Sequence, residues 1–486
     1  MRMVRRVFAV GFVCLAVCFP TIALGDVKLA SIFGDFMVLQ REMAVPVWGW
    51  ADAGEQVTVE FGDQSVQTAA DPEGRWKVSL DSLKANSEGQ SLKVTGKNTI
   101  EIKDVLVGEV WICSGQSNME WAVANSMNPK EEIAAANHPT IRLFNVQGHL
   151  TSPVAKDTCP GEWKVCQPGT VNGFSAVGYF FGRRLQGELN VPVGLVGSNW
   201  GGTRIEPWTS PGGFQSVPEL KSIADQVGAY HEKTKVQGGS PSAIYNAMIH
   251  PLAPFAMRGA IWYQGESNGG EGESYYHKKQ ALVNGWREIF QPKLAFYWVQ
   301  LANFKAPTDD PAGGDGWAKI REAQRKALNI DHTGMAVIID IGQAGDIHPR
   351  NKQDVGKRLS QWALNQNYGR EDLVPSGPIY ESHRVDGNSI RLSFDHVGEG
   401  LIVGLKQGLE ATKEAADGNL AQFAVAGADK KWHWADAHID GDEVVVSSPQ
   451  VAEPVAVRYA YSMNPEGANL YNRNGLPASP FRTDDW

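Results

Sequence analysis

Between about residue 106 and residue 370, short apolar segments alternate with segments of helical periodicity. The apolar segments cover 109–113, 192–197, 258–262, 295–300 and 335–341, and the helical patterns cover 177–189, 275–290, 319–328 and 351–366. Strands that alternate with helices form βαβ units, whose parallel sheet is covered by helices on both faces. This alternation predicts an α/β fold with its functional site at the carboxyl ends of the strands.

The segments on either side of this region have a different pattern. Residues 26–105 contain short alternating runs, such as 56–61 and 76–80, separated by Gly, Asp and Asn turns. That pattern is typical of a small antiparallel β-sandwich. Strand-like runs return at 390–394, 443–446 and 455–459. We therefore expect an N-terminal β-sandwich module (26–105), an α/β catalytic domain (106–374) and a C-terminal β-rich module (375–486).

The first 25 residues have the features of a secretory signal peptide. Three arginines lie among the first six residues, an apolar run covers 7–19, and small residues stand at Ala23 and Gly25, before Asp26. This order predicts cleavage after Gly25 and a secreted or periplasmic protein. Cleavage removes three arginines and no acids from a chain of formal charge −9. An acidic surface argues against nucleic acid as a partner. No later apolar run is long enough to span a bilayer, so we expect no membrane insertion of the mature chain.

Three cysteines remain after that cleavage. Cys159 and Cys166 lie close together in the sequence, and in an oxidising compartment we expect them to form a disulfide, with two reduced thiols as the alternative. Cys113 lies in an apolar run and is expected to be a small buried side chain.

The strongest local signal is the sequence GEVWICSGQSNMEW at 108–121. A buried strand ends near Gly115, and a helical pattern begins around Ser117. A serine at a strand-to-helix junction exposes its hydroxyl at the edge of the sheet, where it can act as a nucleophile. The alternative is that this serine only caps the helix.

Three further signals follow the ends of later strands. His348 suits the base that takes the serine proton, and Asp346 suits the carboxylate that orients this base. The alternative is that Asp346 caps the next helix and His348 lies in a surface loop. The sequences SNWGGT (198–203) and WYQGESN (262–268) offer backbone N–H groups and amide side chains, which are the donors of an oxyanion hole. Ordinary turns are the alternative for both.

The four signals together resemble the SGNH hydrolases, and more closely their sialate O-acetylesterase branch among the carbohydrate acetylesterases. The matching sequences are GQSNMEW, GGTRIEPW, IWYQGESN and DIHPRNKQDVGKRL, with MVLQREMAVPVWGWA and AIYNAMIHPLAPF outside the four blocks. The resemblance spans about residues 29–359. It implies an SGNH-hydrolase-like parallel sheet with flanking helices.

The resemblance also implies residue roles. Ser117 would be the nucleophile and His348 the base. The backbone N–H groups of Ser117 and Gly202 would hold the oxyanion. The superfamily's usual Asn in the third block is replaced in this chain, so the side-chain donor is expected to be Gln264, with Asn268 as the alternative.

The acid departs from the superfamily pattern, because Gly345 stands at its usual position, three residues before the histidine. Asp346 is the nearest carboxylate, Asp340 is the reserve, and a Ser–His dyad without an acid is the third alternative. No His, Cys and carboxylate cluster has the spacing of a zinc site, and no loop has P-loop form. We therefore expect no metal and no cofactor.

The expected activity is hydrolysis of O-acetyl esters of carbohydrates through an acetyl-Ser117 intermediate. The resemblance favours 9-O-acetyl sialic acids as the substrate. Acetylated xylan or another acetylated glycan is the first alternative, and an inactive carbohydrate-binding protein is the second. We expect Arg204 and Glu206 to pair with each other. We expect His250 to be a structural or pocket-lining residue.

Overall fold

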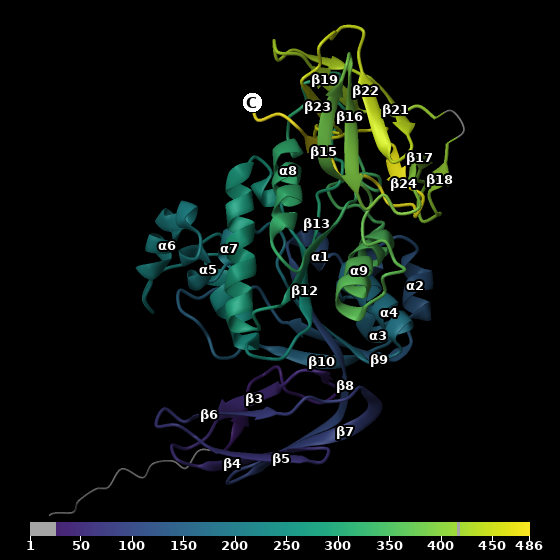
Figure 1. The fold of residues 1–486 in the computed structure, drawn as a ribbon. Helices are drawn as coiled ribbons and strands as arrows, with labels where there is room; N and C mark the ends of the chain where they lie inside the picture. The colour runs from purple at the N-terminus through teal and green to yellow at the C-terminus, as the bar shows by residue number, and fades with distance from the viewer. Residues whose placement is uncertain (1–25, 416–417) are drawn as a thin grey trace, which may run out of the picture.

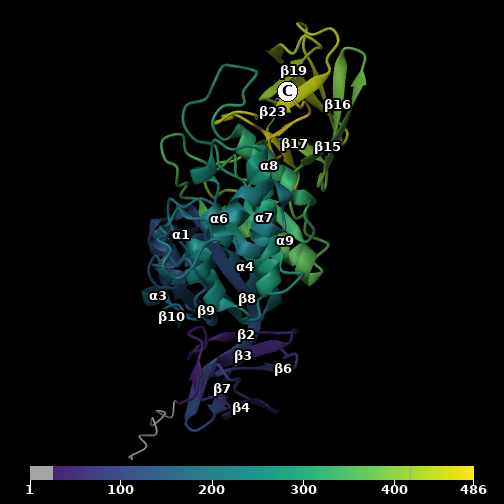
Figure 2. The same ribbon diagram turned by 90° about the vertical axis from the view of Figure 1, so that its left-hand side faces the viewer.

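The computed structural model describes residues 26–415 and 418–486. Three tiers follow one another along the molecule: N-terminal strands, a central layer of strands and helices, and C-terminal strands (Figures 1 and 2). The predicted signal peptide, residues 1–25, lies outside the described residues. None of the helices in the described part of the chain is long and apolar enough to cross a membrane.

The central tier contains a sheet with the strand order β10-β9-β11-β8-β12-β13-β14. The bounds are β8 (Thr99–Gly115), β9 (His138–Val146), β10 (Gly161–Cys166), β11 (Val193–Asn199), β12 (Gly259–Tyr263), β13 (Ala295–Val299) and β14 (Thr333–Ala336). Neighbouring strands on this path are parallel, except β10, which is antiparallel to β9. β12 and β13 are buried along their whole length, as expected for strands covered on both faces. The predicted α/β fold is confirmed.

Long helices cover the two faces of this sheet. They are α4 (Ala176–Leu189), α7 (Glu273–Ile289), α8 (Ala318–Lys326) and α9 (Lys352–Tyr368). α7 and α8 lie on one side, and α4 and α9 lie on the other (Figure 1). Gly356 of α9 lies directly against α4, because a Cβ atom there would be 2.7 Å from the backbone nitrogen of Phe181. Each helix agrees with its predicted range to within a few residues.

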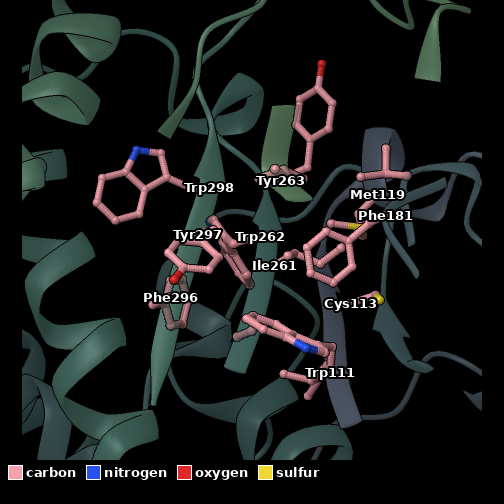
Figure 3. Close-up of a cluster of buried hydrophobic side chains, with 14 of the residues drawn as sticks. Trp111, Cys113, Met119, Phe181, Ile261, Trp262, Tyr263, Phe296, Tyr297 and Trp298 are labelled. Atoms are coloured by element: carbon pink, nitrogen blue, oxygen red, sulfur yellow. The ribbon is translucent and has the colours of Figure 1, made fainter. Parts of the chain in front are cut away.

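Buried aromatic rings fill the space between the sheet and the helices. Trp111 of β8, Trp262 of β12 and Trp298 of β13 are fully buried, and Phe181 of α4 packs edge-on against Trp111 (Figure 3). Cys113 is buried on β8, as predicted, and burial raises the pKa of its thiol. These rings give the central sheet a rigid core under the loops that follow its strands.

Shorter helices lie in the connections. They are α1 (Ser117–Glu120), α2 (Pro129–Ala135), α3 (Pro168–Val171), α5 (Pro211–Gln215), α6 (Lys221–Gly228), η1 (Val123–Asn125), η2 (Glu206–Trp208), η3 (Pro218–Leu220), the π-helical turn η4 (Tyr245–Ile249), η5 (His250–Leu252), η6 (Glu266–Asn268) and η7 (Ala327–Asn329).

The last predicted strand of the central sheet, 335–341, is wrong in its length. β14 ends at Ala336, although the apolar residues up to Ile341 remain buried. The Val337 carbonyl accepts a hydrogen bond at 2.7 Å from the Arg358 side chain of α9. The Arg358 side chain therefore supplies the hydrogen bond that a neighbouring strand would otherwise give. The apolar run continues beyond Ala336 without strand geometry.

The expected disulfide between Cys159 and Cys166 is also wrong, because both thiols are free and buried. Cys166 ends β10, whereas Cys159 precedes that strand. An extended strand rises about 3.3 Å per residue, so the two ends of β10 lie roughly 15 Å apart, and a disulfide joins Cα atoms about 6 Å apart. Burial raises the pKa of Cys159 to about 11 and that of Cys166 to about 12.

The N-terminal tier consists of two small sheets. Its strands are β1 (Lys28–Leu29), β2 (Val38–Gln40), β3 (Val45–Trp50), β4 (Gln56–Phe61), β5 (Gln64–Ala69), β6 (Arg75–Leu80) and β7 (Asn86–Thr95). One sheet has the order β1-β3-β6. In the other, the order β5-β4-β7 leads to the first half of β8, and β2 pairs with β8 at residues 106–108. β8 therefore runs without a break from this tier into the central sheet. It crosses residue 105, where the sequence pattern changes.

The C-terminal tier contains antiparallel sheets of short strands. They are β15 (Ile379–Asp386), β16 (Ser389–Asp395), β17 (Leu401–Leu405), β18 (Lys413–Glu414), β19 (Phe423–Ala426), β20 (Trp432–Trp434), β21 (Asp436–Asp440), β22 (Glu443–Ser447), β23 (Ala456–Tyr459), β24 (Leu470–Asn472) and β25 (Phe481–Arg482). The fully buried Arg321 of α8 donates to the carbonyls of Ser462 and Met463 at 2.6 and 2.9 Å. These contacts anchor the tier to the central layer.

Candidate active site

The predicted site residues lie in loops that leave one edge of the central sheet. β11 and β12 flank β8 as parallel neighbours, and both Asn199 and Tyr263 pair with Gly115. The three strands therefore end level with one another. The chain next enters the segments that contain Ser117, Gly202 and Gln264, which brings three distant parts of the sequence together.

Ser117 begins α1 directly after a sharp turn at the end of β8. Gly115 has a φ of 141°, and a Cβ atom at this position would lie 2.1 Å from the Tyr263 carbonyl oxygen, so only glycine fits. Gln116 is the N-cap residue, so the interpretation of Ser117 as a capping residue is wrong. In the described part of the chain, the Ser117 N–H donates to no acceptor. This is the usual state of a donor in the first turn of a helix.

His348 meets Ser117 across the site. Its Nε2 lies 2.9 Å from Ser117 Oγ, and Trp121 stacks on its ring with a centroid separation of 4.6 Å. Partial burial, followed by the positive charge of Lys352, lowers the pKa of His348, while Asp346 opposes the shift. The imidazole is therefore neutral near pH 7 and can accept the serine proton.

The two candidate acids occupy different environments. Asp346 accepts the backbone N–H of His348 at 2.9 Å, and its Oδ1 lies 3.6 Å from His348 Nδ1. Asp340 is buried and forms a two-pronged ion pair with Arg358 at 2.6 and 2.7 Å, and Tyr471 also donates to it. The carboxylate beside His348 is therefore Asp346, whereas Asp340 links α9 to the C-terminal tier.

The glycine loop, residues 200–203, follows β11 and lies against the nucleophile. Gly202 has a φ of 75°, and within the described residues its N–H has no acceptor. The amide of Gln264, in contrast, is completely buried. It donates to the Thr203 carbonyl at 3.2 Å and to Asn268 Oδ1 at 2.7 Å. Gln264 therefore supports the glycine loop from behind, with both of its N–H donors already engaged.

Asn268, the alternative side-chain donor, is also engaged. Its amide donates to Glu206 at 3.2 Å and to Glu271 at 3.1 Å, and its oxygen accepts the Ile205 N–H. The expectation that a third-block amide points at the oxyanion is not met in this structure. Within the described residues, the N–H groups of Ser117 and Gly202 have no acceptor.

Comparison with known proteins identifies the family. The sequence profile of the family described as "Carbohydrate esterase, sialic acid-specific acetylesterase" matches residues 107–365, more than half of the chain. The chain belongs to this family. The human sialate O-acetylesterase is 30% identical, with 93% of this chain and 92% of the human protein aligned. The mouse enzyme is 27% identical over similar shares, 93% and 94%.

A solved structure is similar over almost the whole esterase. It is a carbohydrate acetylesterase from Xanthomonas citri, with 40% sequence identity and a TM-score of 0.84. The match covers 95% of this chain and 100% of that one. The resemblance to the acetylesterase family is thereby confirmed beyond the catalytic layer, and the chain is a carboxylic ester hydrolase.

Aromatic side chains of the esterase divide into core residues and site residues. Trp111, Trp208 and Trp262 are completely buried. Trp121 and Trp200 are only partly buried, and each stacks on a histidine ring, Trp121 on His348 and Trp200 on His149. The two partly buried rings are thus the ones that can present an apolar face to a sugar.

A buried polar network behind Ser117 was not identified from the sequence. Asn118 donates to Glu266 at 2.6 Å and to the Ile347 carbonyl at 3.0 Å, and it accepts from Lys352. Burial raises the pKa of Glu266, and burial lowers the pKa of Lys352 to about 7 despite the nearby carboxylates. The network ties α1 to the residue before His348. All three side chains belong to the sequence blocks that resemble the family, and this membership is the sequence feature that points to them.

The other polar residues named from the sequence lie apart from Ser117. Arg204 and Glu206 pair at 3.1 Å, as expected, and Lys278 joins them. Although burial opposes the shift, the hydrogen bond and charge of Lys278 lower the pKa of Glu206 to about 2. His250 donates to the Lys156 carbonyl at 3.0 Å and lines a hollow of about 370 Å³ with tryptophans of the N-terminal tier. Among the residues that the structure describes, no cluster of His, Cys, Asp and Glu suits a metal ion.

Proposed function

We propose that the esterase hydrolyses O-acetyl groups of sialic acids through an acetyl-Ser117 intermediate. The observation that supports this mechanism is the 2.9 Å contact between Ser117 Oγ and His348 Nε2. His348 takes the serine proton as Oγ attacks the acetyl carbonyl. The negative charge that forms on the carbonyl oxygen is held by the N–H groups of Ser117 and Gly202.

The same residues complete the reaction in reverse roles. Protonated His348 gives its proton to the departing sugar oxygen, which leaves acetyl-Ser117. Water then enters, and His348 removes a proton from it as its oxygen attacks the acetyl carbonyl. The bond to Ser117 Oγ then breaks, acetate leaves, and His348 returns the proton to Ser117 Oγ. Asp346 stabilises the imidazolium from the exposed side of the loop. Its 3.6 Å separation from Nδ1 makes this a supporting role.

The proposed substrate is a 9-O-acetylated sialic acid. Two relatives that align along nearly the whole chain are sialate O-acetylesterases. The second candidate is another acetylated glycan such as acetyl xylan. It is supported by the greater identity to the Xanthomonas citri enzyme, whose description names carbohydrate in general.

Acetate release from two substrates separates these candidates. We expect the purified enzyme to deacetylate 9-O-acetyl-N-acetylneuraminic acid faster than acetylated xylan, and we expect Ser117→Ala to abolish both reactions. Faster release from xylan would refute the sialate assignment while leaving the mechanism intact. Equal release by wild type and Ser117→Ala would refute the mechanism.

We also propose that residues 1–25 are a cleaved signal peptide and that the protein is secreted or periplasmic. The support is the arginine-rich start, the apolar run and the small residues before Asp26. Mass spectrometry of the protein expressed in a host with a secretion system should find a mature chain that begins at Asp26. An intact N-terminus on the cytoplasmic product would contradict this proposal.

A further inference from the structure

The glycine loop is held on both sides of Gly202. On one side, the Gly201 N–H donates to Glu120 Oε2 at 2.7 Å. On the other side, the Thr203 carbonyl accepts from Gln264 at 3.2 Å. Gly202 stands between these two bonds with its own N–H free in the described part of the chain. The loop is therefore held through both neighbours of Gly202, while the Gly202 N–H stays available.

Glu120 ties this loop to the nucleophile itself. Ser117 begins α1 and Glu120 ends it, so the two residues share one helical turn. A Cβ atom on Gly201 would lie 3.2 Å from Ser117 Cβ and 3.0 Å from Glu120 Oε2, which shows how closely the loop packs on the helix. The Glu120 carboxylate thus sets the distance between the two N–H groups of the proposed oxyanion hole.

The other oxygen of Glu120 connects a third segment. Its Oε1 lies 3.1 Å from His149 Nε2, and the His149 ring stacks on Trp200 with ring planes only 3° apart. Trp200 directly precedes Gly201. The contacts therefore form a closed circuit from Glu120 through Gly201 and Trp200 to His149 and back. Both carboxylate oxygens are used, which suits a residue that holds a loop in one position.

We propose that Glu120 is a positioning residue of the oxyanion hole, which it orients through the Gly201 N–H. The inference rests on the proposed function, since it assumes that Gly202 donates to the oxyanion. Donors must lie within a few tenths of an ångström of their best position to stabilise the transition state. Loss of the Glu120 acceptor frees the Gly201 peptide, and the adjacent Gly202 N–H shifts with it.

Three variants test the proposal with p-nitrophenyl acetate as the substrate. Glu120→Ala removes the acceptor, and we expect kcat to fall about 10- to 100-fold with KM changed by less than about threefold, since misplacing one donor costs less than deleting it. Glu120→Gln keeps an acceptor oxygen at the same reach and should recover most of kcat. The matched control is Asp35→Ala, which removes an exposed carboxylate that accepts a backbone N–H at the same 2.7 Å far from the site.

An organophosphonate that phosphonylates serine, with loss of its leaving group, provides a second readout, because its phosphoryl oxygen enters the oxyanion hole. Its inactivation rate should fall in Glu120→Ala by about the same factor as kcat. A kcat within twofold of wild type, equal losses in Glu120→Ala and Glu120→Gln, or an effect confined to KM would overturn the proposal. If Glu120→Ala does not fold, Glu120→Asp, which keeps the charge but shortens the reach, should show the same loss. A wild-type enzyme inert toward acetyl esters would instead refute the proposed function.

Discussion

Exchanging each candidate acid for its amide, Asp346→Asn or Asp340→Asn, separates catalysis from stability. The two carboxylates lie near His348 in the sequence, but the structure gives them different partners. Asp346 is 39% exposed at its side chain and touches His348, whereas Asp340 is 2% exposed and pairs with Arg358. We expect Asp346→Asn to lower activity and Asp340→Asn to lower stability.

The cost of Asp340→Asn follows from the charge that it leaves behind. Arg358 is buried, and although burial alone would lower its pKa, Asp340 raises that pKa above its ordinary value. Without the carboxylate, a buried guanidinium loses its counter-charge, which costs about 3–5 kcal/mol. The free energy of unfolding should fall by about this amount. Turnover of the folded fraction should stay within about threefold of wild type, because Asp340 does not contact His348.

The cost of Asp346→Asn follows from geometry and exposure. Its oxygen is 3.6 Å from His348 Nδ1, beyond a normal hydrogen bond, and its bond to the His348 backbone N–H is kept by asparagine. An exposed ion pair contributes about 0–1 kcal/mol, and 1.4 kcal/mol corresponds to a tenfold change in rate. We therefore expect kcat to fall by up to about fivefold, with almost no change in stability.

Acetate release at saturating substrate gives kcat for each variant, and urea unfolding followed by tryptophan fluorescence gives stability. A loss of 1,000-fold or more in Asp346→Asn would refute the supporting role and indicate a tight triad. A large loss of kcat in Asp340→Asn at unchanged stability would show that Asp340 acts on the histidine. Equally mild effects of both variants on kcat would favour a Ser–His dyad.

Three further outcomes are expected. Ser117→Ala and His348→Ala should each reduce acetyl-ester hydrolysis by about 1,000-fold or more without unfolding the protein. The double variant should be little worse than either single variant. Near-normal turnover of Ser117→Ala would refute the assignment of Ser117 as the nucleophile. Because His348 must be neutral and its pKa is lowered from the ordinary value of a histidine, kcat/KM should rise with pH through an acid limb centred below that ordinary value and then level off. A midpoint above the ordinary histidine pKa would contradict this. If the N-terminal and C-terminal tiers only stabilise the catalytic layer, deleting residues 26–105 should yield insoluble protein, and free O-acetylated monosaccharides should be deacetylated as well as polymers. A soluble, active truncate or a strong preference for long chains would contradict this stabilising role.

Much of the central tier is predictable because its signals are local and repeated. Continuous apolar strands and helical periods each depend on a few neighbouring residues, so the predicted ranges of α4 and α9 lie within two residues of their observed bounds. The meeting of Ser117 and His348 was predictable for another reason. Parallel strands end at one edge of the sheet, so the residues that follow them must come together.

The hydrogen bonds around the site were not predictable, because they depend on side-chain reach. Gln264 and Asn268 carry the donors that an oxyanion hole needs, yet both amides turn toward the glycine loop and its acidic neighbours. Asn118 and Lys352 stand 234 positions apart, so no local pattern relates them. The family blocks marked these residues without indicating which of them face the substrate and which hold the others in place.

β8 shows why the predicted boundary between the first two modules does not separate two independent units. The alternation of the N-terminal module and the apolar run of the central sheet are two patterns in one 17-residue strand. Its first half alternates because one face of the small sheet is exposed, and its second half is continuously buried because helices cover both faces of the central sheet. The strand ends at Gly115, two residues before Ser117. The N-terminal tier therefore holds the strand that leads to the nucleophile, and a domain cut at residue 105 would divide this strand and leave residues 106–108 without their β2 partners.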